Sequence, residues 1–123
     1  MKTMSMRRAS PDDLEAAYAE AAVRQGRASL EDDFRTANAQ QKTIVAVRGE
    51  LRSRGEEGQA SLLRLLGHHE QDVRVWAASH VLSFAPAQAE EVLERACQAS
   101  PSPSRLNAEM TLREWRAGRL PED

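Results

Sequence analysis

The stretch that decides the fold is DVRVWAASHVLSF, residues 72–84. Its apolar residues recur at helical spacing and form two stripes instead of one. The first stripe holds Val73, Trp76, Ala77, His80, Val81 and Phe84. The second stripe holds Val75, Ala78 and Leu82. Because a helix with two apolar stripes is covered from both sides, the pattern predicts a central helix over about residues 72–84.

The residues around this helix resemble one HEAT repeat, which is a pair of helices. Such a repeat opens its second helix with D-x-V-R-x-x-A-A-x-x-L. This chain reads D-V-R-V-W-A-A-S-H-V-L from Asp72, with one residue fewer before Val73. A short apolar segment, LLRLL at residues 62–66, precedes the match across the polar link GHHE. The resemblance spans about 35–40 residues, the size of one repeat, and implies stacked helical hairpins.

Capping signals place two helices before this repeat. The sequence SPDD at residues 10–13 has the features of a helix start, and Gly26 is predicted to end that first helix. The sequence SLED at residues 29–32 resembles a capping box and predicts the start of a long second helix. Leu30 and Phe34 are then expected on the buried side of this second helix.

The positions of glycine and proline divide the rest of the chain. The predicted helices cover residues 10–26, 29–54, 56–66, 72–84, 86–97 and 104–117. We therefore predict an all-α fold of about six helices, arranged as three stacked helical hairpins in a HEAT-like α-solenoid. Residues 1–9 are predicted as a disordered leader, residues 10–120 as a single HEAT-like helical domain, and residues 121–123 as a tail.

Two segments also resemble a family of small bacterial domains of unknown function with a HEAT-like fold. These segments are VRVWAASH at residues 73–80 and AEMTLREWRAG at residues 108–118. The resemblance covers about residues 12–120. It implies the helical fold predicted above, and it implies no particular activity.

Composition argues against several classes of protein. The 17 basic and 19 acidic residues give a net charge of −2, which disfavours partners bound by neutralising phosphate, such as nucleic acid or an anionic membrane. No apolar run is long enough to span a bilayer. Cys97 is the single cysteine, so an intramolecular disulfide is excluded. These features predict a cytoplasmic location.

The titratable residues form no recognisable catalytic or metal-binding motif. His68 and His69 are expected at a turn, and the spacing of the three histidines matches no zinc motif. His80 lies in an apolar stripe and is expected to be buried against a backbone carbonyl or a carboxylate. Cys97 and Trp76 are expected in the core, although tryptophan is also common in interfaces. We therefore predict no catalytic residue, no cofactor and no metal ion.

The leading functional hypothesis is a non-catalytic protein-interaction module. The second helices of stacked pairs line one surface, and the exposed candidates for partner binding there are Arg35, Arg74, Ser79 and Arg113. A specific form of this hypothesis is a bacterial immunity protein that binds and neutralises a toxin. The alternatives are a HEAT-like nucleic-acid-binding protein and a small enzyme with a site centred on His80. The sequence leaves the oligomeric state open.

Overall fold

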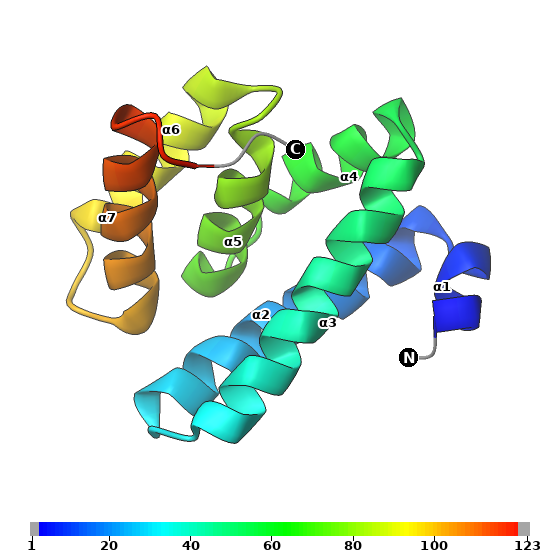
Figure 1. Cartoon of the computed structure of the whole chain (residues 1–123), viewed down its shortest axis with the longest axis horizontal. Coiled ribbons are helices and arrows are strands. Elements are labelled where there is room, and N and C mark those ends of the chain that lie inside the picture. The colour runs from blue at the N-terminus through cyan, green and yellow to red at the C-terminus, as the bar shows by residue number, and fades with distance from the viewer. Residues whose placement is uncertain (1–2, 121–123) are drawn as a thin grey trace.

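The computed structural model describes residues 3–120, with side chains from residue 6 onward, and all regular structure in this range is helical. The helices are α1 (Thr3–Arg8), α2 (Pro11–Leu30), α3 (Phe34–Ser53), α4 (Glu56–Leu65), α5 (Gln71–Val81), α6 (Pro86–Cys97) and α7 (Pro103–Arg116). Figure 1 shows α2 and α3 as a long antiparallel hairpin, with α4 to α7 packed to one side of it and α1 on the other side. The predicted all-α fold is confirmed.

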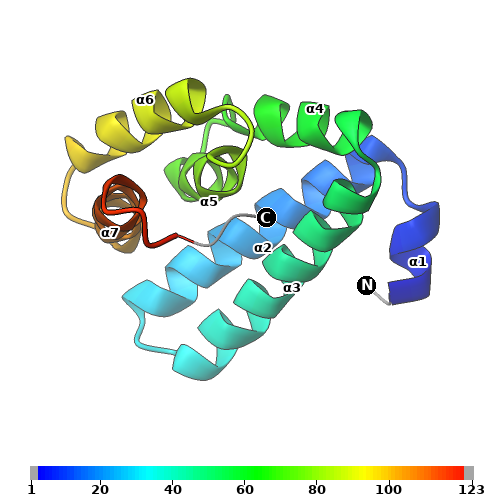
Figure 2. The same ribbon diagram turned by 45° about the horizontal axis from the view of Figure 1, so that its top comes forward.

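Helix α5 lies at the centre of the shorter helices, as the two apolar stripes predict. It packs against α2, α4, α6 and α7, and Figure 2 shows it enclosed between α4, α6 and α2. Val73, Ala77 and Ala78 are completely buried. Helix α2 is equally central, because it contacts α3, α4, α5 and α7. The arrangement as three stacked hairpins of a solenoid stays a prediction.

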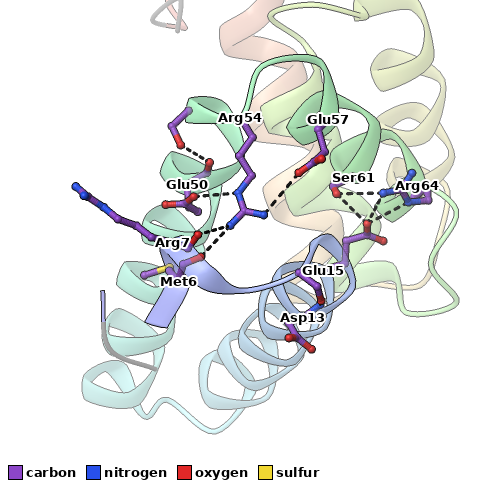
Figure 3. Close-up of polar contacts among 11 residues, drawn as sticks. Met6, Arg7, Asp13, Glu15, Glu50, Arg54, Glu57, Ser61 and Arg64 are labelled. Atoms are coloured by element: carbon purple, nitrogen blue, oxygen red, sulfur yellow. Dashed lines mark hydrogen bonds and ion pairs between the residues drawn. The ribbon is translucent and has the colours of Figure 1, made fainter. Parts of the chain in front are cut away.

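The predicted disorder of residues 1–9 is wrong for α1. The Met6 side chain is buried against the core. The Arg54 guanidinium donates to the backbone carbonyls of Met6 at 2.9 Å and Arg7 at 3.3 Å, and also to the Glu50 carboxylate (Figure 3). Carbonyls in the last turn of a helix lack hydrogen-bond donors within the helix, and the Arg54 guanidinium provides donors to two of them. This contact is remote in sequence and gives no local signal. Residues 1–2 and 121–123 lie outside the described residues.

A second polar cluster joins α2 to α4. One carboxylate oxygen of Glu15 accepts hydrogen bonds from the Ser61 hydroxyl at 2.8 Å and from the Arg64 guanidinium at 2.7 and 3.0 Å (Figure 3). Ser61 is fully buried, so its hydroxyl requires such a partner. The two clusters in Figure 3 therefore hold helices together.

Gly26 does not end a helix, because α2 continues to Leu30. Gly26 is buried, and a Cβ atom at this position would lie 2.6 Å from the Asp72 carboxyl group. The glycine therefore leaves room for the Asp72 carboxyl group where α5 packs against α2. Sequence alone does not distinguish this role from a helix end.

The predicted start of the second long helix is also wrong. Helix α3 is capped by Asp33, whose carboxylate accepts a hydrogen bond from the backbone N–H of Thr36. Leu30 and Phe34 lie beside the α2–α3 turn and are 69% and 66% exposed, so they are not core residues. The apolar periodicity of α3 starts one turn later, at Ala37.

Candidate functional site

The four residues predicted to bind a partner do not form one site. The Arg74 guanidinium donates to the backbone carbonyls of His68 at 2.8 Å and His69 at 2.9 Å, which closes the α4–α5 turn. The Ser79 hydroxyl donates to the Trp76 carbonyl within α5. Arg35 at the start of α3 and Arg113 near the end of α7 are both exposed. Two cavities, described below, lie at the two ends of α5, and none of these four residues is part of their lining.

His80 is half-buried instead of fully buried, and its hydrogen-bond partner is a tyrosine instead of a backbone carbonyl or a carboxylate. The Tyr18 hydroxyl lies 2.7 Å from Nδ1 of His80, and Tyr18 is fully buried. Burial, together with the charge of Arg48, lowers the pKa of His80 to about 4. Burial raises the pKa of Tyr18. Both side chains are therefore neutral at pH 7, and His80 does not act as a cation.

Cys97, His68 and the second tryptophan, Trp115, have structural roles. Burial and the nearby charge of Glu109 raise the pKa of Cys97, which disfavours the reactive thiolate. Trp115 is half-buried, and its indole N–H donates to Glu90. His68 accepts a hydrogen bond from the backbone N–H of Glu70 in the α4–α5 turn. No group of three potential metal ligands occurs among the described residues.

A cleft of about 400 Å³ lies between α2, α5 and α7, and we call it the Asp72 cleft. Gln25 and Ser29 line it from α2, Asp72 and Trp76 from α5, and residues 102–110 from the start of α7. Asp72 and Trp76 are four residues apart on α5, so they face the same direction one turn apart. The Asp72 cleft therefore combines a carboxylate with an aromatic ring.

The Asp72 carboxylate has no side-chain partner within the described part of the chain. Its carboxylate accepts no hydrogen bond and forms no ion pair there. Partial burial raises the pKa of Asp72, and the charge of Glu70 raises it further. Gly26 gives the carboxyl group its room, because any side chain there would occupy the same space. A carboxylate that is partly removed from water without a partner is poised to accept a cation.

The nearby wall of α7 is linked to α5 by a hydrogen bond and exposes apolar side chains. The Gln71 side-chain amide donates to the Ser104 hydroxyl at 2.7 Å, which links the first turns of α5 and α7. Leu106 and Met110 line the Asp72 cleft and are 57% and 50% exposed. Leu30 and Phe34 lie at the α2–α3 turn, which is at the same end of the molecule as the start of α7 (Figures 1 and 2). Exposed apolar side chains gathered in this way are typical of interaction surfaces.

The comparisons with known proteins identify the family. The family model of a domain of unknown function, DUF2019, matches residues 12–115. The chain belongs to the DUF2019 family. The resemblance to a family of small domains of unknown function is thereby confirmed. The match extends from the first turn of α2 into the last turn of α7, so the Asp72 cleft is built entirely from DUF2019 helices.

A solved structure supports the fold of this DUF2019 chain. The chain is similar to the crystal structure of the protein RPA1889 from Rhodopseudomonas palustris CGA009, with a TM-score of 0.87 and 26% sequence identity. The similarity covers 96% of this chain and 98% of that chain. No curated protein matches the sequence. Among the described residues, no helix has the length and hydropathy of a membrane span.

Sequence reasoning missed the Asp72 cleft for identifiable reasons. An aspartate near a helix start is explained by the helix dipole, so Asp72 did not stand out. Leu30 and Phe34 fit a buried stripe only because the start of α3 was misplaced by one turn. The available signal was the spacing of Asp72 and Trp76 at i and i+4, which sets an acid beside an aromatic residue.

Proposed function

We propose that this DUF2019 chain is a non-catalytic protein-interaction module. The Asp72 cleft would receive an arginine or lysine side chain that is flanked by apolar residues on the partner. One observation carries the proposal. Of the five large apolar side chains that are exposed in the described range, Leu106 and Met110 line this cleft, and Leu30 and Phe34 lie at the α2–α3 turn, which follows the lining residue Ser29.

The chemistry of the Asp72 cleft favours a cation over other ligands. A guanidinium or ammonium group would form a charge-assisted hydrogen bond with the Asp72 carboxylate and could lie against the Trp76 indole. Leu106 and Met110 would contact apolar residues on either side of that cation. An anionic ligand would instead be repelled by a carboxylate that has no compensating partner.

The two alternative functions gain less support. A nucleic acid would bring phosphates to an acidic cleft on a chain with a net charge of −2. An enzyme centred on His80 would need a group that orients and activates the imidazole. The hydrogen-bond partner of His80 is instead the neutral hydroxyl of Tyr18. The acidic cleft therefore disfavours nucleic-acid binding, and the Tyr18–His80 pair disfavours an enzyme centred on His80.

An immunity protein is a narrower form of the same proposal, because its partner is a toxin. The same surface would serve this role. Co-purification of a toxin with the wild-type chain, and its loss with Asp72→Asn, would narrow the proposal to immunity. An unchanged yield of toxin with Asp72→Asn would place the toxin contact elsewhere.

The proposal can be tested by fluorescence in a Trp115→Phe background, where Trp76 is the remaining tryptophan of the two. The probes are short peptides with a central arginine between leucines, and matched peptides with a central glutamate. We expect the arginine peptides to change the Trp76 emission and the glutamate peptides to leave it unchanged. Asp72→Asn should weaken binding about tenfold, because one charge-assisted hydrogen bond is lost.

The matched control is Asp13→Asn, which makes the same change of charge on the exposed first turn of α2. This control should bind the arginine peptides as tightly as the parent. The proposal is wrong if arginine and glutamate peptides bind alike, or if both aspartate variants weaken binding equally.

A further inference from the structure

A second cavity, of about 200 Å³, lies at the opposite end of α5, where α3, α4 and α5 meet. We call it the His80 cavity. Its polar lining comes from Arg48 and Arg52 of α3, Gln59 of α4, and His80 and Ser83 at the end of α5. None of its lining residues within the described range is acidic. Its charge is therefore opposite to that of the Asp72 cleft.

Two arginines on one helix face give the His80 cavity its positive charge. Arg48 and Arg52 are four residues apart on α3, which places like charges on neighbouring turns. Burial lowers the pKa of Arg48, and the charge of Arg52 lowers it further. Arg52 is exposed and forms no hydrogen bond or ion pair with a described residue. Its guanidinium donors are thus available to a ligand.

Two of the nearby carboxylates are directed to a different arginine. Glu50 of α3 and Glu57 of α4 lie 2.9 and 3.6 Å from the Arg54 guanidinium, which points toward α1 (Figure 3). Arg52 and Arg54 therefore have different environments although they are two residues apart. The first lines the His80 cavity, and the second holds helices together.

His80 contributes a hydrogen-bond donor to this cavity. The buried Tyr18 hydroxyl has one hydrogen bond, to Nδ1 of His80, and a buried hydroxyl proton requires an acceptor. Tyr18 therefore donates to Nδ1, and the proton of the neutral imidazole resides on Nε2. Nε2 has no partner among the described residues, while the His80 side chain lines the cavity.

The start of α4 adds backbone donors. Its N-cap residue, Gly55, makes no side-chain capping hydrogen bond, so the first N–H groups of α4 have no side-chain partner. Gly55 and Gly58 both line the His80 cavity. A Cβ at Gly58 would lie 1.7 Å from the Leu51 carbonyl oxygen, so only glycine allows α4 to begin this close to α3.

We propose that the His80 cavity binds a small oxyanion, a carboxylate or a phosphate, between Arg52, Gln59 and Nε2 of His80. All three supply N–H donors, and a planar guanidinium matches the oxygen geometry of both kinds of anion. This inference is independent of the Asp72 cleft, which lies at the other end of α5 and has the opposite charge.

The test is a titration of the full chain with inorganic phosphate and, separately, succinate at constant ionic strength. Binding is followed by isothermal calorimetry and by the Nε2 resonance of His80 in NMR spectra. We expect millimolar or tighter binding, a shift of the His80 resonance, and no shift of the exposed His69. Arg52→Gln should weaken binding about tenfold by removing a charged donor.

Arg113→Gln is the matched control, because Arg113 is also exposed and lies on a different helix. It should bind both anions like the wild-type chain. The proposal is overturned if neither anion binds at millimolar concentration, if the two arginine variants weaken binding equally, or if binding leaves the His80 resonance unchanged.

Discussion

The two ends of α5 differ in charge although a single face of one helix contributes to both. Asp72, Trp76 and His80 follow one another at intervals of four residues, and the rings of Trp76 and His80 are 6.1 Å apart. Around Asp72 the neighbouring helix α7 supplies apolar side chains. Around His80 the neighbouring helix α3 supplies arginines. The character of each cavity is therefore determined by the helix that lines it opposite α5, which is α7 beside Asp72 and α3 beside His80.

A glycine lies beside each cavity, Gly26 beside the Asp72 cleft and Gly58 in the His80 cavity. Substitution of the two glycines by alanine should change stability to different extents. At Gly58 a new Cβ would meet the backbone of Leu51, which cannot move without separating α3 from α4. We expect Gly58→Ala to lower the free energy of unfolding by about 3 kcal/mol in urea denaturation, the upper part of the range for overpacking.

Gly26→Ala is the comparison for that variant. Its Cβ would meet the carboxyl group of Asp72, and a side chain can turn away. The helix preference of alanine offsets this cost by about 1 kcal/mol, so the net change in stability should be small. Equal destabilisation by the two variants would contradict the different roles of these glycines.

The lowered pKa of His80 predicts that the folded chain loses stability in acid, and that His80 causes part of this loss. The pKa of His80 is about 4 in the folded chain, against an ordinary value of 6.5. Between these values the unfolded chain binds more protons, so stability is present above pH 6.5 and falls as the pH drops towards 4. We expect a loss of about 2–3 kcal/mol from this residue, measured by denaturation at several pH values.

His80→Asn should remove this part of the pH dependence, and the exposed control His69→Asn should retain it. The difference between the two variants isolates His80 from carboxylates that titrate in the same range. A His80→Asn profile parallel to that of the wild-type chain would show that the neutral, half-buried histidine does not determine the acid response.

Ser104→Ala should affect the other end of α5 with a smaller effect. It removes the hydroxyl that accepts from Gln71 and joins α5 to α7 beside the Asp72 cleft. We expect a loss of about 1 kcal/mol, the usual contribution of one hydrogen bond. The NMR resonances of His80 should stay unchanged, because the His80 cavity contains no residue of α7. A shift of those resonances would mean that the two ends of α5 are coupled.

Local signals in the sequence predicted most of the helices. Pro86 begins α6, the acidic pair after Gly55 begins α4, and the two stripes identified α5 as a central helix. The predictions failed where a contact is remote in sequence. Helix α1 is held by Arg54, and Gly26 faces Asp72 across a helix contact. No local sequence pattern predicts either of these two contacts.

The candidate sites were predictable only in part for the same reason. The apolar stripe predicted a buried His80, which is half-buried, while its partner Tyr18 is 62 residues away in sequence. Arg52 could be explained by the dipole at the end of α3, so its position in a cavity was not predicted. Charged residues near helix ends satisfy a local rule wherever they point, and the tertiary packing decides which of them face a ligand.

The most direct test of the opposite character of the two ends is an NMR experiment on one sample. The chain is titrated first with the arginine-containing peptide and then with phosphate. The account predicts that the peptide shifts the Met110 methyl resonance and that phosphate shifts the Arg52 Nε and His80 Nε2 resonances. Each ligand should bind with the same affinity whether or not the other is bound. Peptide and phosphate acting on the same set of resonances, or on neither set, would contradict it.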